Sequence, residues 1–136
     1  MRQIFDYPIS DVPDLTTEQM IEVDRAMIED YGIKLIQMME NAGRNLAHPA
    51  RARFLDADPR SKRVVVLAGR GGNGGGAIVC ARRLSNSGAV VDVRLTREPH
   101  EFNGIPAQQL GILDRMQVPI SHAGDTLLSS ESDGLQ

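Results

Sequence analysis

The fold of this chain is decided by one stretch, Gly69-Arg70-Gly71-Gly72-Asn73-Gly74-Gly75-Gly76. It follows an apolar run at residues 64–68 and precedes a run with helical periodicity at residues 77–84. A buried strand, a glycine loop and a helix start in this order are typical of an anion-binding turn, because glycine allows close backbone approach and positive φ. The first helical amides have no internal partner and lie at the positive end of the helix dipole, so they suit a phosphate. The alternative is a flexible linker, which rarely lies between a buried strand and an amphipathic helix.

The length and composition of the chain predict one small soluble domain of 136 residues. A formal net charge of −3 argues against a nucleic-acid partner, which would require a basic face. No stretch is long and apolar enough to span a membrane, and residues 1–7 lack the apolar region of a secretory signal. The single cysteine, Cys80, excludes an intramolecular disulfide. We therefore expect a cytoplasmic protein with neither a nucleic-acid nor a membrane partner.

The N-terminal third predicts an arm followed by two helices. We expect residues 1–14 to form an extended arm, and Thr16 to cap a helix that ends near Asp30, with Gln19 completing a capping box. Asp24 falls on the apolar face of that helix, either as a buried carboxylate that ties down a neighbouring loop or as part of a site.

The second helix is predicted from apolar residues at spacings of three and four over residues 35–46. Gly43 lies inside it, which indicates that another element packs close to its backbone. Pro49 is expected to kink or end the helix, and residues 51–60 to form a polar connector.

The remaining elements predict an α/β fold. Residues 64–67 are continuously apolar, as expected of a strand covered on both faces, and residues 90–95 form the second strand of a right-handed βαβ unit. We then expect a loop at 97–104, a helix at 107–116 and a short strand at 118–120. Residues 122–136 are polar and predict a disordered tail.

The glycine loop is compatible with more than one nucleotide. Its Gly69-x-Gly71-x-x-Gly74 spacing matches the dinucleotide fingerprint, which is a weak signal by itself. A Rossmann enzyme also needs an acidic residue at the end of the second strand, but Asp92 is mid-strand. Arg94 and Arg97 follow it. There are two interpretations of these arginines: they suit a 2′-phosphate, or they are simply solvated. A P-loop is excluded, because no Lys-Ser or Lys-Thr pair closes the stretch.

Other chemical groups give weaker signals. Cys80 falls inside a predicted helix, which favours a small buried hydrophobic residue over a nucleophile. Glu40 and Asn41 lie beside the apolar stripe of the second helix and could border a pocket. Metal-ligand spacing is absent among the three histidines, which are His48, His100 and His122.

Four stretches together resemble the N-terminal domain of the YjeF family, the NAD(P)H-hydrate epimerases. One of them, residues 69–84, is similar to the family loop Gly-Pro-Gly-Asn-Asn-Gly-Gly-Asp-Gly followed by Ala-Arg-x-Leu. The likeness covers residues 15–121, as a partial domain. The stretches lie at residues 15–25, 31–43, 69–84 and 104–119.

The resemblance implies a Rossmann-like three-layer α/β/α sandwich with a mostly parallel sheet and two helices before the first strand. It implies an isomerase that epimerises the C6 hydrates of NADH and NADPH, with a potassium ion as cofactor and a possible homodimer. By position, Asn73 would coordinate potassium. The residues expected to contact the hydrate are Gly72, Asn73, Gly74, Gly75 and Gly76.

The chain also departs from the family pattern. Arg70 stands at the loop proline, Gly72 at the first loop asparagine and Gly76 at the loop aspartate. The family domain continues through further strands, so its C-terminal half is expected to be missing here, and the catalytic acid and base stay unassigned. A non-catalytic nucleotide-binding or protein-interaction scaffold is the alternative. An ordinary NAD(P)-dependent oxidoreductase is least favoured, because the ribose-binding acid is absent and no substrate domain follows.

Overall fold

The structure is a computed structural model that describes residues 14–122. The chain divides into two compact units, residues 1–35 and residues 36–136, which are treated separately below. The predicted arm and the predicted disordered tail lie outside the described residues, apart from Asp14 and His122. No helix within residues 14–122 has both the length and the apolarity needed to cross a membrane.

The first unit contributes helix α1, Thr17–Glu29. The predicted capping box is confirmed: the Gln19 amide donates to Thr16 Oγ1 at 3.2 Å, and the Thr16 amide donates to Gln19 Oε1 at 2.8 Å. This exchange satisfies two amide donors that the helix leaves unpaired. Asp24 is exposed, so its interpretation as a buried carboxylate is wrong.

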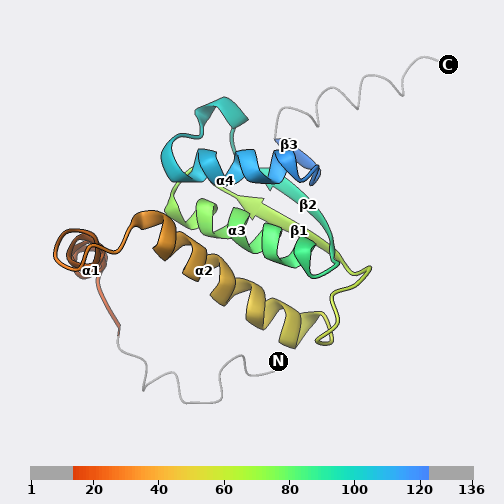
Figure 1. Ribbon diagram of the computed structural model, residues 1–136, viewed down its shortest axis with the longest axis horizontal. Helices are drawn as coiled ribbons and strands as arrows, with labels where there is room; N and C mark the ends of the chain where they lie inside the picture. The colour runs from red at the N-terminus through yellow and green to blue at the C-terminus, as the bar shows by residue number, and fades with distance from the viewer. Residues whose placement is uncertain (1–13, 123–136) are drawn as a thin grey trace. The chain divides into compact units, whose positions relative to one another are not determined.

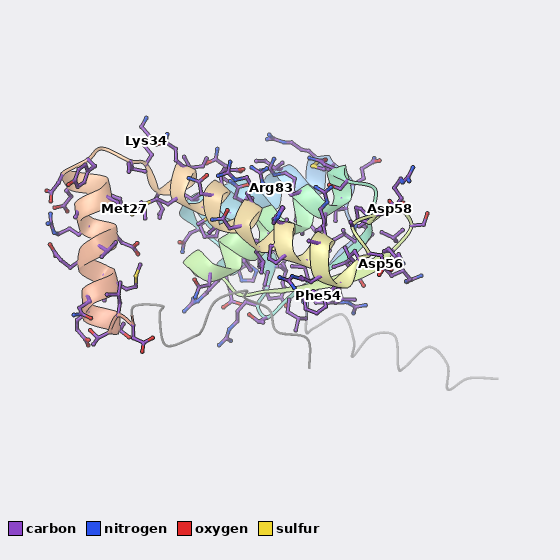
Figure 2. The ribbon with its side chains drawn as sticks, turned by 90° about the horizontal axis from the view of Figure 1, so that it is seen from below. Met27, Lys34, Phe54, Asp56, Asp58 and Arg83 are labelled. Atoms are coloured by element: carbon purple, nitrogen blue, oxygen red, sulfur yellow. The ribbon has the colours of Figure 1, made fainter. Side chains whose placement is uncertain are left out.

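Helix α2 spans Leu35–Pro49 and continues directly into a π-helical turn, η2, at Ala50–Phe54. The prediction that residues 51–60 form a polar connector is therefore wrong for its first four residues. The α-helix ends at Pro49, as predicted, because proline has no amide to donate to the preceding turn, and the chain continues in the wider turn of a π-helix. Phe54 at the end of η2 is exposed, and Asp56 and Asp58 follow it in the connecting turn (Figure 2).

The sheet has three parallel strands in the order β1-β2-β3. Its strands are β1 (Arg63–Ala68), β2 (Val90–Leu95) and β3 (Ile120–His122). The register pairs Val66 with Val93 and Ala68 with Leu95, so the carboxyl ends of the strands meet at one edge. The third strand begins two residues later than predicted, because Val118 still caps the preceding helix through its amide, which donates to the Leu113 carbonyl at 3.1 Å.

Helices of the second unit pack on one face of this sheet (Figure 1). These are α3 (Gly72–Asn86) and α4 (Gly104–Arg115), together with the end of α2, and a short 3-10 turn, η3 (Pro99–Glu101), precedes α4. The core between them is mainly aliphatic and also contains Phe102. It includes Val66, Ala68, Ile78, Leu84, Val91, Val93, Leu95 and Leu113.

The opposite face of the sheet is open within the described residues. Val65 is 61% exposed and Leu67 is 72% exposed, so the two-sided burial predicted for this strand is not observed. The parallel α/β class and the two helices before β1 are confirmed. Residues 14–122 thus supply the sheet and one helical layer of the predicted sandwich.

Gly43 brings α2 and α3 into close contact. A Cβ at this position would lie 2.4 Å from Val79 Cβ and 2.8 Å from the Gly76 carbonyl oxygen, so a side chain does not fit. The predicted close packing at Gly43 is confirmed. This contact fixes α2 beside the first two turns of α3, where the candidate site lies.

Candidate functional site

The glycine turn, residues 69–71, joins β1 to α3 and is shorter than the predicted loop, because α3 already begins at Gly72. Gly71 is the N-cap, with extended backbone and no side-chain cap. The Gly75 amide donates to the Gly71 carbonyl at 2.9 Å and makes the first helical hydrogen bond. The three preceding amides, at residues 72–74, therefore have no acceptor within the helix and can receive an anion.

The glycines of this stretch serve close packing, whereas the predicted need for positive φ is wrong. Positive φ occurs at none of the glycines in residues 69–76. A Cβ at Gly74 would lie 1.7 Å from the Gly69 carbonyl oxygen, and a Cβ at Gly75 would lie 2.3 Å from Met39 Sδ. At Gly71 and Gly72 a Cβ would meet no atom within 4 Å, so the outer side of the turn is open.

The five predicted site residues divide into two groups. Gly72 and Asn73 are exposed in the first turn of α3, while Gly74, Gly75 and Gly76 are buried beneath them. The Asn73 side chain has no hydrogen-bond partner among residues 14–122, so its amide oxygen is available to a ligand.

The end of β2 borders the same turn. The Thr96 amide donates to the Ala68 carbonyl at 3.0 Å, and Thr96 Oγ1 would lie 3.7 Å from a Cβ at Gly69. The turn therefore sits at the carboxyl edge of the parallel strands, where open α/β sheets bind their ligands.

Asp92 and Arg94 do not form a ribose or 2′-phosphate site. Both project from β2 on the open face of the sheet, and Arg94 Nη2 donates to Asp92 Oδ2 at 2.9 Å. The pair neutralises itself, which agrees with the solvated alternative.

Glu40 is the most connected carboxylate near the site. Its oxygens accept hydrogen bonds from Arg82 Nη2, from Arg83 Nη2 at 3.0 Å and from Gln109 Nε2 at 3.1 Å. Gln109 is only 1% exposed, so this carboxylate ties α2 to both α3 and α4. Burial alone would raise the pKa of Glu40, but the hydrogen bonds and the charge of Arg82, with Arg83 and Gln109, outweigh it and lower the pKa.

Glu40 and Asn41 also line a shallow hollow of about 320 Å³ with Ile36 and Gln37, as the sequence suggested. The sequence did not reveal the three partners of Glu40. They are 42 to 69 residues away along the chain, and no local pattern connects them.

Cys80 is buried in α3, as predicted, and burial raises the pKa of its thiol to about 11. A thiolate is the reactive form, so we expect Cys80 in the folded protein to react with a thiol reagent at pH 8 at least tenfold more slowly than in urea. Reaction is followed by the release of thionitrobenzoate, with free cysteine as the control for the reagent. Equal rates in buffer and in urea would contradict the burial of Cys80.

The histidines do not form a metal site. No group of three or more His, Cys, Asp or Glu side chains that could hold a metal ion occurs in the described part of the chain. His122 Nδ1 lies 3.4 Å from Glu98 Oε1.

The chain is similar in sequence to known enzymes of one kind. The family described as "YjeF-related protein N-terminus" matches residues 35–133. The NAD(P)H-hydrate epimerase of Dehalogenimonas lykanthroporepellens is 41% identical over 100 residues, which are 74% of this chain and 40% of that protein. The bifunctional NAD(P)H-hydrate repair enzyme Nnr of Salinibacter ruber is 41% identical over 107 residues, which are 77% of this chain and 19% of that protein.

A solved structure shares the fold. The crystal structure of the yeast protein YNL200c superposes with a TM-score of 0.70 at 28% sequence identity, covering 82% of this chain and 47% of that chain. The chain thus spans less than half the length of each of these three relatives. On the family match, the sequence identities and the shared fold, the chain belongs to the family of YjeF-related protein N-termini.

Proposed function

We propose that this chain binds the hydrates of NADH and NADPH at the glycine turn and takes part in their epimerisation at C6. The observation that carries the proposal is the open first turn of α3, where the amides of residues 72–74 lack helical acceptors. This first turn of α3 lies at the carboxyl edge of the sheet. Relatives that match this segment are named NAD(P)H-hydrate epimerases.

The turn would hold the diphosphate of the dinucleotide. Backbone amides and the positive end of the helix dipole favour phosphate oxygens, and the open space at Gly71 and Gly72 lets those oxygens approach the backbone. Arg70 is exposed in the turn and adds a positive charge where the family has proline.

Potassium would be held in part by Asn73. Its exposed amide oxygen has no partner among residues 14–122 and fits one position of a hard cation's oxygen shell. Gly76, at the position of the family aspartate, is buried beside Ala42 and offers no side-chain oxygen. A bound potassium ion would supply positive charge next to the phosphates.

Replacing Asn73 with alanine should weaken potassium-dependent binding of the hydrate at least fivefold, because the side-chain oxygen is lost while the turn backbone stays intact. The measurement is a calorimetric titration of the NADPH hydrate in potassium and in sodium buffers. Asn45→Ala, an exposed asparagine on α2, is the matched control and should bind as the parent does. Equal affinities of Asn73→Ala and the parent in potassium would contradict the assignment of Asn73.

The activity is tested with one pure NADPH-hydrate epimer, whose conversion is followed by chromatography with and without potassium. Interconversion above the spontaneous rate supports the isomerase. Binding without interconversion favours the scaffold alternative, provided that circular dichroism shows the protein to be folded. The polar side chains that Gly72 and Gly76 lack also favour that alternative. A homodimer and a cytoplasmic location stay predictions.

A further inference from the structure

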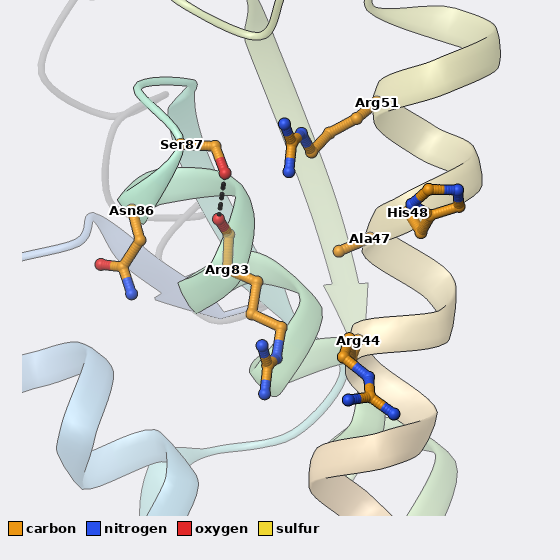
Figure 3. Close-up of a pocket in the computed structure, with 7 residues that line it drawn as sticks. All are labelled: Arg44, Ala47, His48, Arg51, Arg83, Asn86 and Ser87. Carbon is orange, nitrogen blue, oxygen red and sulfur yellow. Dashed lines mark hydrogen bonds between the residues drawn. The ribbon is translucent and has the colours of Figure 1, made fainter. Parts of the chain in front are cut away.

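A basic hollow lies at the far end of α3 from the glycine turn. It has a volume of about 250 Å³ and opens between α2, η2 and the C-terminal end of α3 (Figure 3). Three of its seven lining residues are arginines, one is a histidine and none is acidic. They are Arg44, Ala47, His48, Arg51, Arg83, Asn86 and Ser87.

The positive charges of the basic hollow are poorly compensated. The side chains of Arg44 and Arg51 form no ion pair or hydrogen bond with other residues in the 14–122 range. Arg83 reaches Glu40 through Nη2, but its Nε is buried and has no acceptor. A buried N–H without a partner costs free energy, and an anion in the hollow could supply the acceptor.

The basic side chains of α2 and η2 share one face. Arg44, His48 and Arg51 follow one another at intervals of four and three residues, so they lie on one face of α2 and η2. In Figure 3, the Arg51 and Arg83 side chains extend into the space between the two helical segments. The cluster occurs in a chain whose net charge is −3, so it does not reflect a basic composition.

We propose that the basic hollow is a second anion site, separate from the glycine turn, that takes one or two phosphate groups. Guanidinium groups present paired donors that match phosphate oxygens, and Asn86 adds an amide group to the lining. A hollow of 250 Å³ is smaller than the roughly 300–1,000 Å³ of sites for drug-sized ligands, so it suits a small anion better than a whole dinucleotide. Since α3 has 15 residues, the two sites are about 20 Å apart.

The test is a titration of the full chain with inorganic pyrophosphate at constant ionic strength, followed through backbone amide NMR shifts. We expect saturable shifts at residues 44–51 and 83–87. The double variant Arg44→Gln/Arg51→Gln should bind at least tenfold more weakly. Arg115→Gln, which removes an exposed arginine from α4, is the matched control and should change the affinity less than twofold.

The outcomes separate this proposal from the proposed function. Shifts confined to residues 71–74 would place pyrophosphate at the glycine turn alone and overturn the second site. Absence of saturable shifts, or equal weakening by Arg115→Gln, would overturn it as well. A parallel titration with ADP identifies the source of the phosphate: tighter binding at the same amides assigns a nucleotide phosphate, and equal or weaker binding assigns the free ion.

Discussion

Replacing Gly74 with alanine should lower the free energy of unfolding by about 3 kcal/mol. The added Cβ would lie 1.7 Å from the carbonyl oxygen of Gly69 and 2.4 Å from its carbonyl carbon. Both are backbone atoms of the glycine turn, directly after β1, so no side-chain rotation relieves the overlap. Either the glycine turn or the first turn of α3 must move, and the amides of residues 72–74 move with it.

The measurement is urea unfolding of the variant and the parent, followed by circular dichroism. Gly72→Ala is the matched control, because a Cβ at Gly72 meets no atom within 4 Å. Since alanine favours helix over glycine by about 1 kcal/mol, that control should leave stability unchanged or slightly higher. Equal destabilisation by the two variants would show that the close approach of Gly74 to Gly69 is not what requires glycine.

Replacing Glu40 with glutamine should lower the free energy of unfolding by about 2 kcal/mol. The substitution keeps the shape of the side chain but removes the negative charge that Arg82 and Arg83 share. It also replaces one acceptor oxygen with a donor, so at least one of the three donors around residue 40 loses its partner. Three helices meet at this carboxylate, so the loss affects the packing of α2, α3 and α4 together.

The same carboxylate predicts an acid-sensitive stability. Because the folded protein lowers the pKa of Glu40 below its ordinary 4.5, the ionised form stabilises the fold above that pH. This contribution is lost as the pH falls through the lowered pKa, where Glu40 becomes protonated in the folded state. The parent should therefore lose more stability than Glu40→Gln between pH 5 and pH 3, as measured by urea unfolding at each pH.

The control for Glu40 is an exposed ion pair of similar geometry. Arg60 Nη2 lies 2.7 Å from Asp58 Oδ2, and the hydrogen bond from Arg60 lowers the pKa of Asp58 to about 2. Both side chains are solvated, so Asp58→Asn should leave the free energy of unfolding almost unchanged. A loss as large as that of Glu40→Gln would mean that burial is not what distinguishes the two pairs.

Local sequence signals predicted the elements of this fold well. The Thr16 and Gln19 pair predicted the start of α1, and the strand predicted at residues 90–95, where Asp92 and Arg94 alternate with apolar residues, matched β2 residue for residue. Gly43 even predicted a tertiary contact, because a glycine inside an amphipathic helix usually marks the close approach of another element to its backbone. These signals succeed because capping, periodicity and close approach act over a few neighbouring residues.

The errors arose where long-range contacts decide the structure. The helical start at Gly72 contradicts glycine's poor helix propensity, and packing against α2 at Met39 and Gly43 outweighs it. The three partners of Glu40 and the convergence of arginines at the basic hollow depend on the crossing of α2 and α3. No short stretch of the sequence indicates either of these two features.

The open face of the sheet gives this chain an unused source of stability. Val65, Leu67 and Val90 present aliphatic side chains to water there, and each is more than half exposed. Fully burying one valine or leucine side chain contributes about 1.5–3 kcal/mol, whereas these three now contribute little to holding the fold together. A layer laid over this face would therefore add several kcal/mol to the free energy of unfolding without altering any contact inside the present core.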